Sequence, residues 1–111
     1  LIPISRTIGE GILVDEMLFC FTHDIEIDWM LPGIKPTGKR VEIPLVAIVK
    51  FRGDKLHNEH IYWDQASVLV QIGLLDPTGL PVAGIETAKK LLDEQLPSNQ
   101  LMAKWDHSEE K

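Results

Sequence analysis

Residues 55–71 read Lys-Leu-His-Asn-Glu-His-Ile-Tyr-Trp-Asp-Gln-Ala-Ser-Val-Leu-Val-Gln. The stretch follows a tight Gly53-Asp54 turn and is rich in β-branched and aromatic residues, a composition that favours one long strand. An ionisable side chain, Asp64, stands in the middle of this apolar run. A carboxylate in that position must be paired, solvated in a cavity, or shifted towards its neutral form. The function therefore depends on the surroundings of Asp64.

Three further strands are predicted before this stretch, at residues 1–8, 12–22 and 41–52. Each contains apolar residues with strand periodicity, and glycine-containing turns separate the strands of each hairpin. The Gly9-Glu10-Gly11 turn closes the first hairpin, which places Arg6 near Val14 and on the same face as Glu16. This register predicts an Arg6–Glu16 ion pair.

The two-residue turn at Gly53-Asp54 sets a register for the second hairpin. In that register, polar residues of the stretch 55–71 alternate along one face of the hairpin, opposite apolar residues of the strand at 41–52. The expected pairs are Ala47 with His60, Leu45 with Tyr62, and Ile43 with Asp64.

Residues 23–40 form a long connection broken by Pro32-Gly33 and by Pro36-Thr37-Gly38. Long loops in compact domains are usually functional or flexible. This one carries Trp29, Met30 and Leu31, which are too apolar to stay in water. Two interpretations remain open: a lid or cavity rim, or a loop packed on the core.

The strand pattern ends at Gln71-Ile-Gly73, and residues 76–79 form a turn. Apolar residues at helical spacing predict a short amphipathic helix over residues 85–96. Leu101, Met102 and Trp105 are expected to dock once more, before a polar tail at 106–111. The predicted fold is α+β, with a curved, mainly antiparallel four-stranded sheet over residues 1–75. Residues 76–111 are expected to form a C-terminal helical extension and a polar tail.

The composition fits a single domain of 111 residues. The net charge of −6 argues against a nucleic-acid or anionic-membrane partner, because phosphate binding requires clustered Lys and Arg. The one basic cluster, residues 35–40, is expected to be a solvated loop. A single cysteine, Cys20, and the lack of a membrane span or signal peptide predict a cytoplasmic protein. The chain begins at Leu1, without Met and within a predicted strand, which suggests a piece of a longer protein.

His60, Tyr62 and Asp64 form the leading catalytic candidate. Desolvation in an apolar cavity raises the pKa of a carboxyl group and makes it a competent acid or base. A neighbouring hydroxyl or imidazole can hydrogen-bond an enolate as charge develops on it. The alternative is that Asp64 hydrogen-bonds to the backbone, while Tyr62 and His60 are amphipathic wall residues.

A metal site is not expected. His23, Asp24, Glu26 and Asp28 alternate without converging in a standard ligand spacing, so a solvated loop is favoured. The sequence contains no glycine-rich phosphate loop. No cofactor is predicted.

Three segments that follow one another along the chain carry a family resemblance. They are residues 31–44 (Leu-Pro-Gly-Ile-Lys-Pro-Thr-Gly-Lys-Arg-Val-Glu-Ile-Pro), 51–56 (Phe-Arg-Gly-Asp-Lys-Leu) and 61–64 (Ile-Tyr-Trp-Asp), the last followed by Gln71-Ile-Gly73. Over about residues 4 to 75 the chain resembles a SnoaL-like domain of the nuclear transport factor 2-like superfamily. The segments 80–84 and 97–99 are similar to a subgroup with a C-terminal extension. The resemblance implies a cone-shaped α+β fold around a pocket.

The resemblance also implies polyketide-cyclase chemistry of the isomerase type, without a cofactor, on a small apolar carbonyl compound. Asp64 corresponds by position to the acid/base residue, while His60 and Tyr62 would orient or polarise the substrate. The predicted substrate-binding residues are Trp29, Leu45, Ala47 and Trp63. The family's N-terminal helices are missing, so a second copy or the C-terminal helix is expected to cover the exposed face, and a homodimer is predicted. Since fold does not determine function, a non-catalytic ligand-binding or dimerisation module is the alternative.

Overall fold

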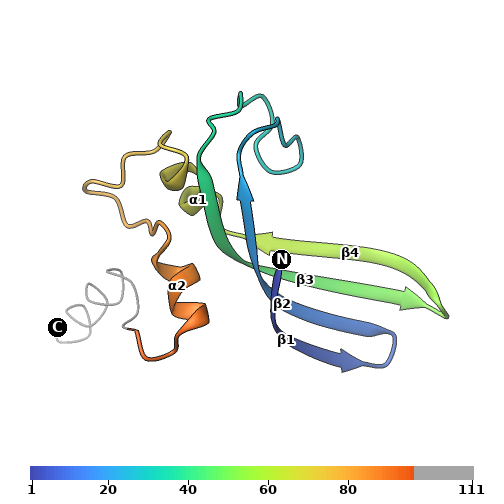
Figure 1. Cartoon of the computed structure of the whole chain (residues 1–111). Coiled ribbons are helices and arrows are strands. Elements are labelled where there is room, and N and C mark those ends of the chain that lie inside the picture. Colours follow the sequence, from blue (N-terminus) through green and yellow to red (C-terminus); the bar gives the residue numbers. More distant parts are fainter. Residues whose placement is uncertain (97–111) are drawn as a thin grey trace.

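The computed structural model describes residues 1–96 (Figure 1). Four strands form one antiparallel sheet in the order β1-β2-β3-β4, and two short helices follow it. The elements are β1 (Ile2–Gly9), β2 (Ile12–Thr22), β3 (Arg40–Arg52), β4 (Lys55–Trp63), α1 (Gln65–Gln71) and α2 (Glu86–Leu92). The predicted α+β class and the four-stranded antiparallel sheet are confirmed, and the first three strands lie close to their predicted bounds.

The long strand expected over residues 55–71 is wrong. β4 ends at Trp63, and the chain turns into α1. Asp64 has extended backbone angles, and its side chain accepts a hydrogen bond from the backbone N–H of Ser67 at 3.2 Å. It is therefore the N-cap of α1, because this bond satisfies one of the free N–H groups of the first helical turn.

The side chain of Gln71 docks α1 onto β3. Pairing between β3 and β4 reaches only Leu45, so Glu42 has no partner from β4. Gln71 fills this position: its Oε1 accepts from the backbone N–H of Glu42 (2.9 Å), and its Nε2 donates to the carbonyl of Glu42 (3.0 Å). Nε2 also donates to Ser67 Oγ (3.1 Å), which in turn donates to the carbonyl of Gly84 (2.7 Å). One amide thus joins the sheet, α1 and the segment before α2.

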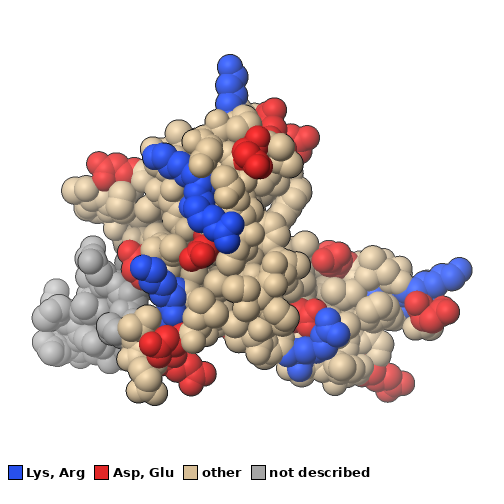
Figure 2. Space-filling view, viewed as in Figure 1, with Lys and Arg blue, Asp and Glu red and all other residues tan. Residues whose placement is uncertain are grey.

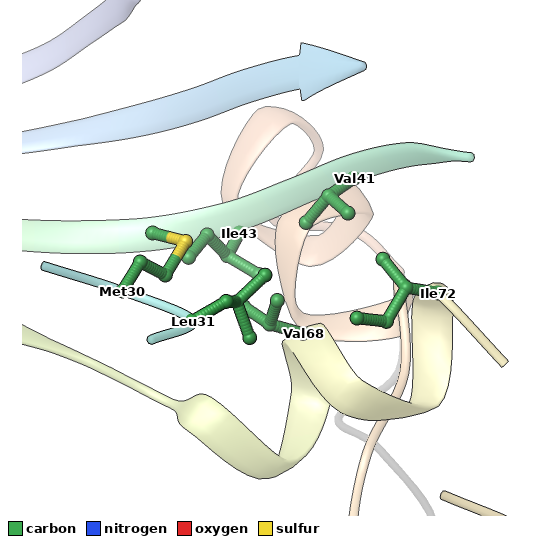
Figure 3. Close-up of a cluster of buried hydrophobic side chains, with 6 residues drawn as sticks. All are labelled: Met30, Leu31, Val41, Ile43, Val68 and Ile72. Atoms are coloured by element: carbon green, nitrogen blue, oxygen red, sulfur yellow. The ribbon is translucent and has the colours of Figure 1, made fainter. Parts of the chain in front are cut away.

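The core lies between β3, α1 and the long connection (Figure 3). Six buried side chains form it: Met30, Leu31, Val41, Ile43, Val68 and Ile72. Met30 and Leu31 come from the connection that was interpreted either as a lid or as a core-packed loop. Both side chains are fully buried, so this part of the connection belongs to the core.

The register of the first hairpin differs by one residue from the prediction. β1 runs to Gly9, which pairs with Ile12, so the turn contains only Glu10 and Gly11. Gly11 has a positive φ of 68°, which glycine adopts without a Cβ penalty. Arg6 consequently pairs with Asp15, and the predicted Arg6–Glu16 ion pair is wrong.

The register of the second hairpin is correct only beside its turn. Arg52 pairs with Lys55, and Phe51 with Leu56, as expected, but Lys50 pairs with Asn58. His57 is therefore an extra residue in β4, a β-bulge that shifts all later pairs by one. β1 has a similar irregularity at Ile4, between the Pro3–Met17 and Ser5–Glu16 pairs. Both outer strands of the sheet are thus irregular, a common protection against edge-to-edge association.

The C-terminal part contains a shorter helix than predicted. α2 ends at Leu92 instead of continuing to Leu96. Asp93 leaves the helical conformation, and Lys90 Nζ donates to the carbonyls of Glu94 and Leu96, which closes the chain into a turn. Ala88 is the buried residue of α2, which packs near β3. The predictions for Leu101, Met102, Trp105 and the tail lie outside the described residues.

The helices cover only one end of the sheet. Figure 1 shows that the hairpin ends of the four strands project away from α1 and α2. Apolar side chains near the two hairpin turns include Ile8 and Leu56, which are exposed. Among residues 1–96, the sheet therefore has surface next to the core that no helix covers.

Candidate functional site

Asp64 lies at the junction between β4 and α1. Its side chain is bonded to the first turn of the helix, and the residue is exposed. The predicted pairing of Asp64 with Ile43 is wrong, because β4 has already ended at Trp63. The alternative in which Asp64 hydrogen-bonds to the backbone describes this arrangement. Its catalytic role remains a prediction.

His60 and Tyr62 lie on the other face of the sheet from Leu45 and Ala47. His60 pairs with Ile48 and Tyr62 with Val46, since the bulge at His57 reverses the expected alternation. Both residues are exposed, Tyr62 to 58%. The expected common face of His60 and Tyr62 with Leu45 and Ala47 is therefore wrong. Any catalytic role of His60 and Tyr62 would belong to the face of Val46 and Ile48.

The four residues predicted to bind substrate do come together. Trp63 pairs with Leu45, and Ala47 lies on the same face two residues along β3. Trp29, from the long connection, makes an edge-to-face contact with Trp63 at a centroid distance of 6.0 Å. The register adds two residues that the sequence analysis missed, Met17 opposite Leu45 and Ile61 opposite Ala47. These six residues, Met17, Trp29, Leu45, Ala47, Ile61 and Trp63, are called the apolar wall below.

Aromatic contacts link the apolar wall to the core. Trp29 also packs edge-to-face against Phe19 at 6.0 Å, and Phe19 contacts Phe21 at 5.3 Å. Phe19, Phe21 and Trp63 pack against the core cluster. Trp29 is nevertheless 55% exposed and Ile61 40% exposed. The wall is thus a supported surface with exposed apolar side chains at its edge.

An ion pair borders the wall on β1 and β2. Arg6 Nε donates to Asp15 Oδ1 (2.7 Å), and Arg6 Nη2 donates to Asp15 Oδ2 (2.8 Å). The hydrogen bond from Arg6 lowers the pKa of the Asp15 carboxyl group, and the same contact raises the pKa of Arg6. Asp15 pairs with Ala47 across β2 and β3, so the ion pair lies on the same face as the wall. The sequence analysis missed this contact because its register was displaced.

The predicted solvated segment at residues 23–28 is correct for its three acidic residues and wrong for His23. Asp24, Glu26 and Asp28 are exposed, whereas His23 is fully buried. His23 Nδ1 accepts a hydrogen bond from the backbone N–H of Thr37 (3.2 Å), and its Nε2 has no partner in the described part of the chain. Among residues 1–96 no group of three or more His, Cys, Asp or Glu side chains could hold a metal ion.

Charges of both signs are distributed over the surface. Figure 2 shows Lys and Arg interspersed with Asp and Glu towards the hairpin ends of the sheet. Lys35, Lys39 and Arg40 of the basic cluster are exposed, as predicted. Both described helices are seven residues long, too short to span a bilayer.

Comparisons with known proteins show a likeness to a solved structure. No family model matches the chain, and no curated protein matches it. The structure is similar to the crystal structure of AclR, a proposed hydroxylase from Streptomyces galilaeus, with a TM-score of 0.53 and 26% sequence identity. The similarity covers 65% of this chain and 45% of AclR, so the chain spans less than half of that protein. The likeness supports a related α+β fold, in agreement with the curved sheet of nuclear transport factor 2-like domains.

Proposed function

We propose that this chain is a SnoaL-like domain that binds a small, mostly apolar molecule on the apolar wall. The observation that carries the proposal is the exposure of Trp29 and Ile61 beside the supported surface of Leu45, Ala47 and Trp63. Exposed apolar surface that continues a core commonly marks a ligand-binding or interaction site. Aromatic side chains supply large contact areas in such sites.

Acid/base catalysis by Asp64 is the second candidate function. Asp64 directly follows Trp63 of the wall, and only its Oδ1 is engaged by the helix cap. Its Oδ2 makes no hydrogen bond within the described residues. The likeness to a proposed enzyme, AclR, favours this candidate as well. Asp64 would transfer a proton without help from His60 and Tyr62, which lie on the opposite sheet face.

Binding to the wall is tested with Ile61→Ser. Ile61 and Tyr62 are neighbours on β4 with similar exposure, but they point to opposite faces of the sheet. We expect Ile61→Ser to weaken binding of 2-acetylnaphthalene about five- to tenfold, because the ligand no longer buries the apolar side chain. The measurement is a titration followed by chemical shifts of the isotopically labelled protein.

Tyr62→Ser is the matched control for this titration. We expect it to leave the affinity for 2-acetylnaphthalene within about twofold of the unmodified chain. The reason is that Tyr62 lies on the sheet face opposite to the apolar wall. A larger loss with Tyr62→Ser than with Ile61→Ser would place the ligand on the other face and refute the proposed wall.

Catalysis by Asp64 is separated from its capping role with two substitutions. Asp64→Ala should lower the free energy of unfolding by about 1 kcal/mol, because the Ser67 N–H loses its acceptor. Asp64→Asn should change the stability by only a few tenths of a kcal/mol, since asparagine is an equally good N-cap. If Asp64 is the acid/base residue, Asp64→Asn will remove turnover of a carbonyl substrate while the chain stays folded. Full turnover by this variant would exclude the catalytic candidate.

A further inference from the structure

A groove of about 570 Å³ runs along the β1 side of the sheet. Its lining includes Pro3, Arg6, Asp15 and Met17, which share one face according to the strand register. Across the next strand pair, Met17 lies opposite Leu45 and Asp15 opposite Ala47. Adjacent strands are about 4.8 Å apart, so the groove and the apolar wall are neighbouring strips of one surface.

Arg6 is the cationic group of this groove. A guanidinium carries five N–H donors, and Asp15 accepts two of them, from Nε and Nη2. The remaining three have no partner in the described part of the chain, and the Arg6 side chain is 60% exposed. Because Asp15 holds the guanidinium plane at two points, the free Nη1 and Nη2 hydrogens form an orientated fork that matches a carboxylate.

The other two charged side chains that line the groove, Asp15 and Glu16, are acidic, but both already accept hydrogen bonds from neighbouring side chains. Each oxygen of Asp15 accepts one hydrogen bond from Arg6, so the negative charge of this carboxylate is paired. Glu16 also lines the groove, but its side chain belongs to the opposite face, where it pairs with Val46 and accepts a hydrogen bond from the Ser5 hydroxyl.

We propose that the ligand of the apolar wall is an apolar carboxylic acid whose carboxylate binds the free donors of Arg6. Its apolar body would lie across Met17, Leu45 and Ala47 towards Trp63. This inference rests on the proposed function and adds the chemical class of the ligand and the residue that selects it.

The test compares 2-naphthoate with 2-acetylnaphthalene, two probes of nearly equal shape that differ in charge at pH 7. We expect the unmodified chain to bind 2-naphthoate about tenfold more tightly at low ionic strength, a modest preference because Arg6 is partly exposed and screened by water. Arg6→Gln should abolish this preference and leave the affinity for 2-acetylnaphthalene within about twofold. Added salt should reduce the preference in the unmodified chain.

Arg52→Gln is the matched control, because Arg52 is an exposed arginine beside the Gly53 turn and outside the groove. It should keep the preference for 2-naphthoate. Asp15→Asn should keep that preference, since the amide oxygen still accepts a hydrogen bond from Arg6 while the groove loses a negative charge. Equal binding of both probes by the unmodified chain, unchanged in Arg6→Gln, would overturn the inference and leave the proposed wall intact. Failure of both probes to bind would instead refute the proposed function.

Discussion

We expect Gln71→Ala to lower the free energy of unfolding by about 3 kcal/mol. The Gln71 amide is the hydrogen-bond partner of both backbone groups of Glu42 on the side of β3 where β4 is absent. Its removal also takes away a donor to Ser67 Oγ. Each buried polar group left without a partner costs about 1–3 kcal/mol, and a small domain loses roughly 4–8 °C in Tm per kcal/mol. The melting temperature should therefore fall by roughly 10–20 °C.

Thermal and urea unfolding followed by circular dichroism measure this loss. Gln65→Ala is the matched control: Gln65 is exposed on the same helix and makes a single longer bond, 3.3 Å, to the carbonyl of Met30. Gln71→Glu keeps an acceptor for the N–H of Glu42 but loses both donor contacts. Its free energy of unfolding should therefore be lower than that of the unmodified chain. If Gln71→Ala and Gln65→Ala have the same stability, the amide does not hold α1 to the sheet.

The positions of the strands could be predicted from the sequence, but their registers could not. β2 has the predicted bounds, because its apolar residues are framed by glycine on one side and a polar segment on the other. Each hairpin was nevertheless displaced by one residue. The first turn contains two residues instead of three, and the second hairpin has a bulge at His57 that no turn rule reveals. A one-residue shift moves every side chain to the other face, which is why the predicted site was divided.

The helix α1 was missed for a related reason. Residues 66–70, Ala-Ser-Val-Leu-Val, have the composition of a strand, and their helical conformation depends on tertiary contacts. A local signal did exist, because Asp64 is a favoured N-cap residue directly before an apolar run. The decisive contact, Gln71 with the backbone of Glu42, joins residues that are 29 positions apart. Local patterns cannot report such a pairing.

The four residues predicted to bind substrate lie together despite the wrong register, because their selection depended on composition. Trp29 and Trp63 are large aromatic residues next to predicted core segments, and Leu45 and Ala47 share a face of β3 in any register. Met17 and Ile61 were missed because they join this face only through their pairing partners. The Arg6–Asp15 pair was missed for the same reason. Strand periodicity therefore identified the members of a face within a strand, but not the neighbours across strands.

Leu31→Ala should lower the free energy of unfolding by about 3 kcal/mol, the middle of the range for truncating a buried leucine. Leu31 is buried with Ile43 and Val68 in the core cluster, and its backbone N–H donates to the carbonyl of Ile27 (2.7 Å). A loss of this size is expected for a core residue. Truncating a lid residue that packs only over bound ligand would change the stability of the free protein little. Urea unfolding of the free chain measures it.

Trp29→Ala is the control for this prediction, since Trp29 lies in the same connection but is 55% exposed. Its removal should cost about 1 kcal/mol, mainly the lost edge-to-face contacts with Phe19 and Trp63. The two variants should also differ in binding. Trp29→Ala should lower the affinity for 2-acetylnaphthalene severalfold while the chain stays folded, because the substitution removes part of the wall. Equally small stability losses in the two variants would mean that the connection is a lid throughout. A larger loss for Leu31→Ala means instead that the connection is anchored in the core at Leu31 and presents Trp29 to ligand from a fixed position.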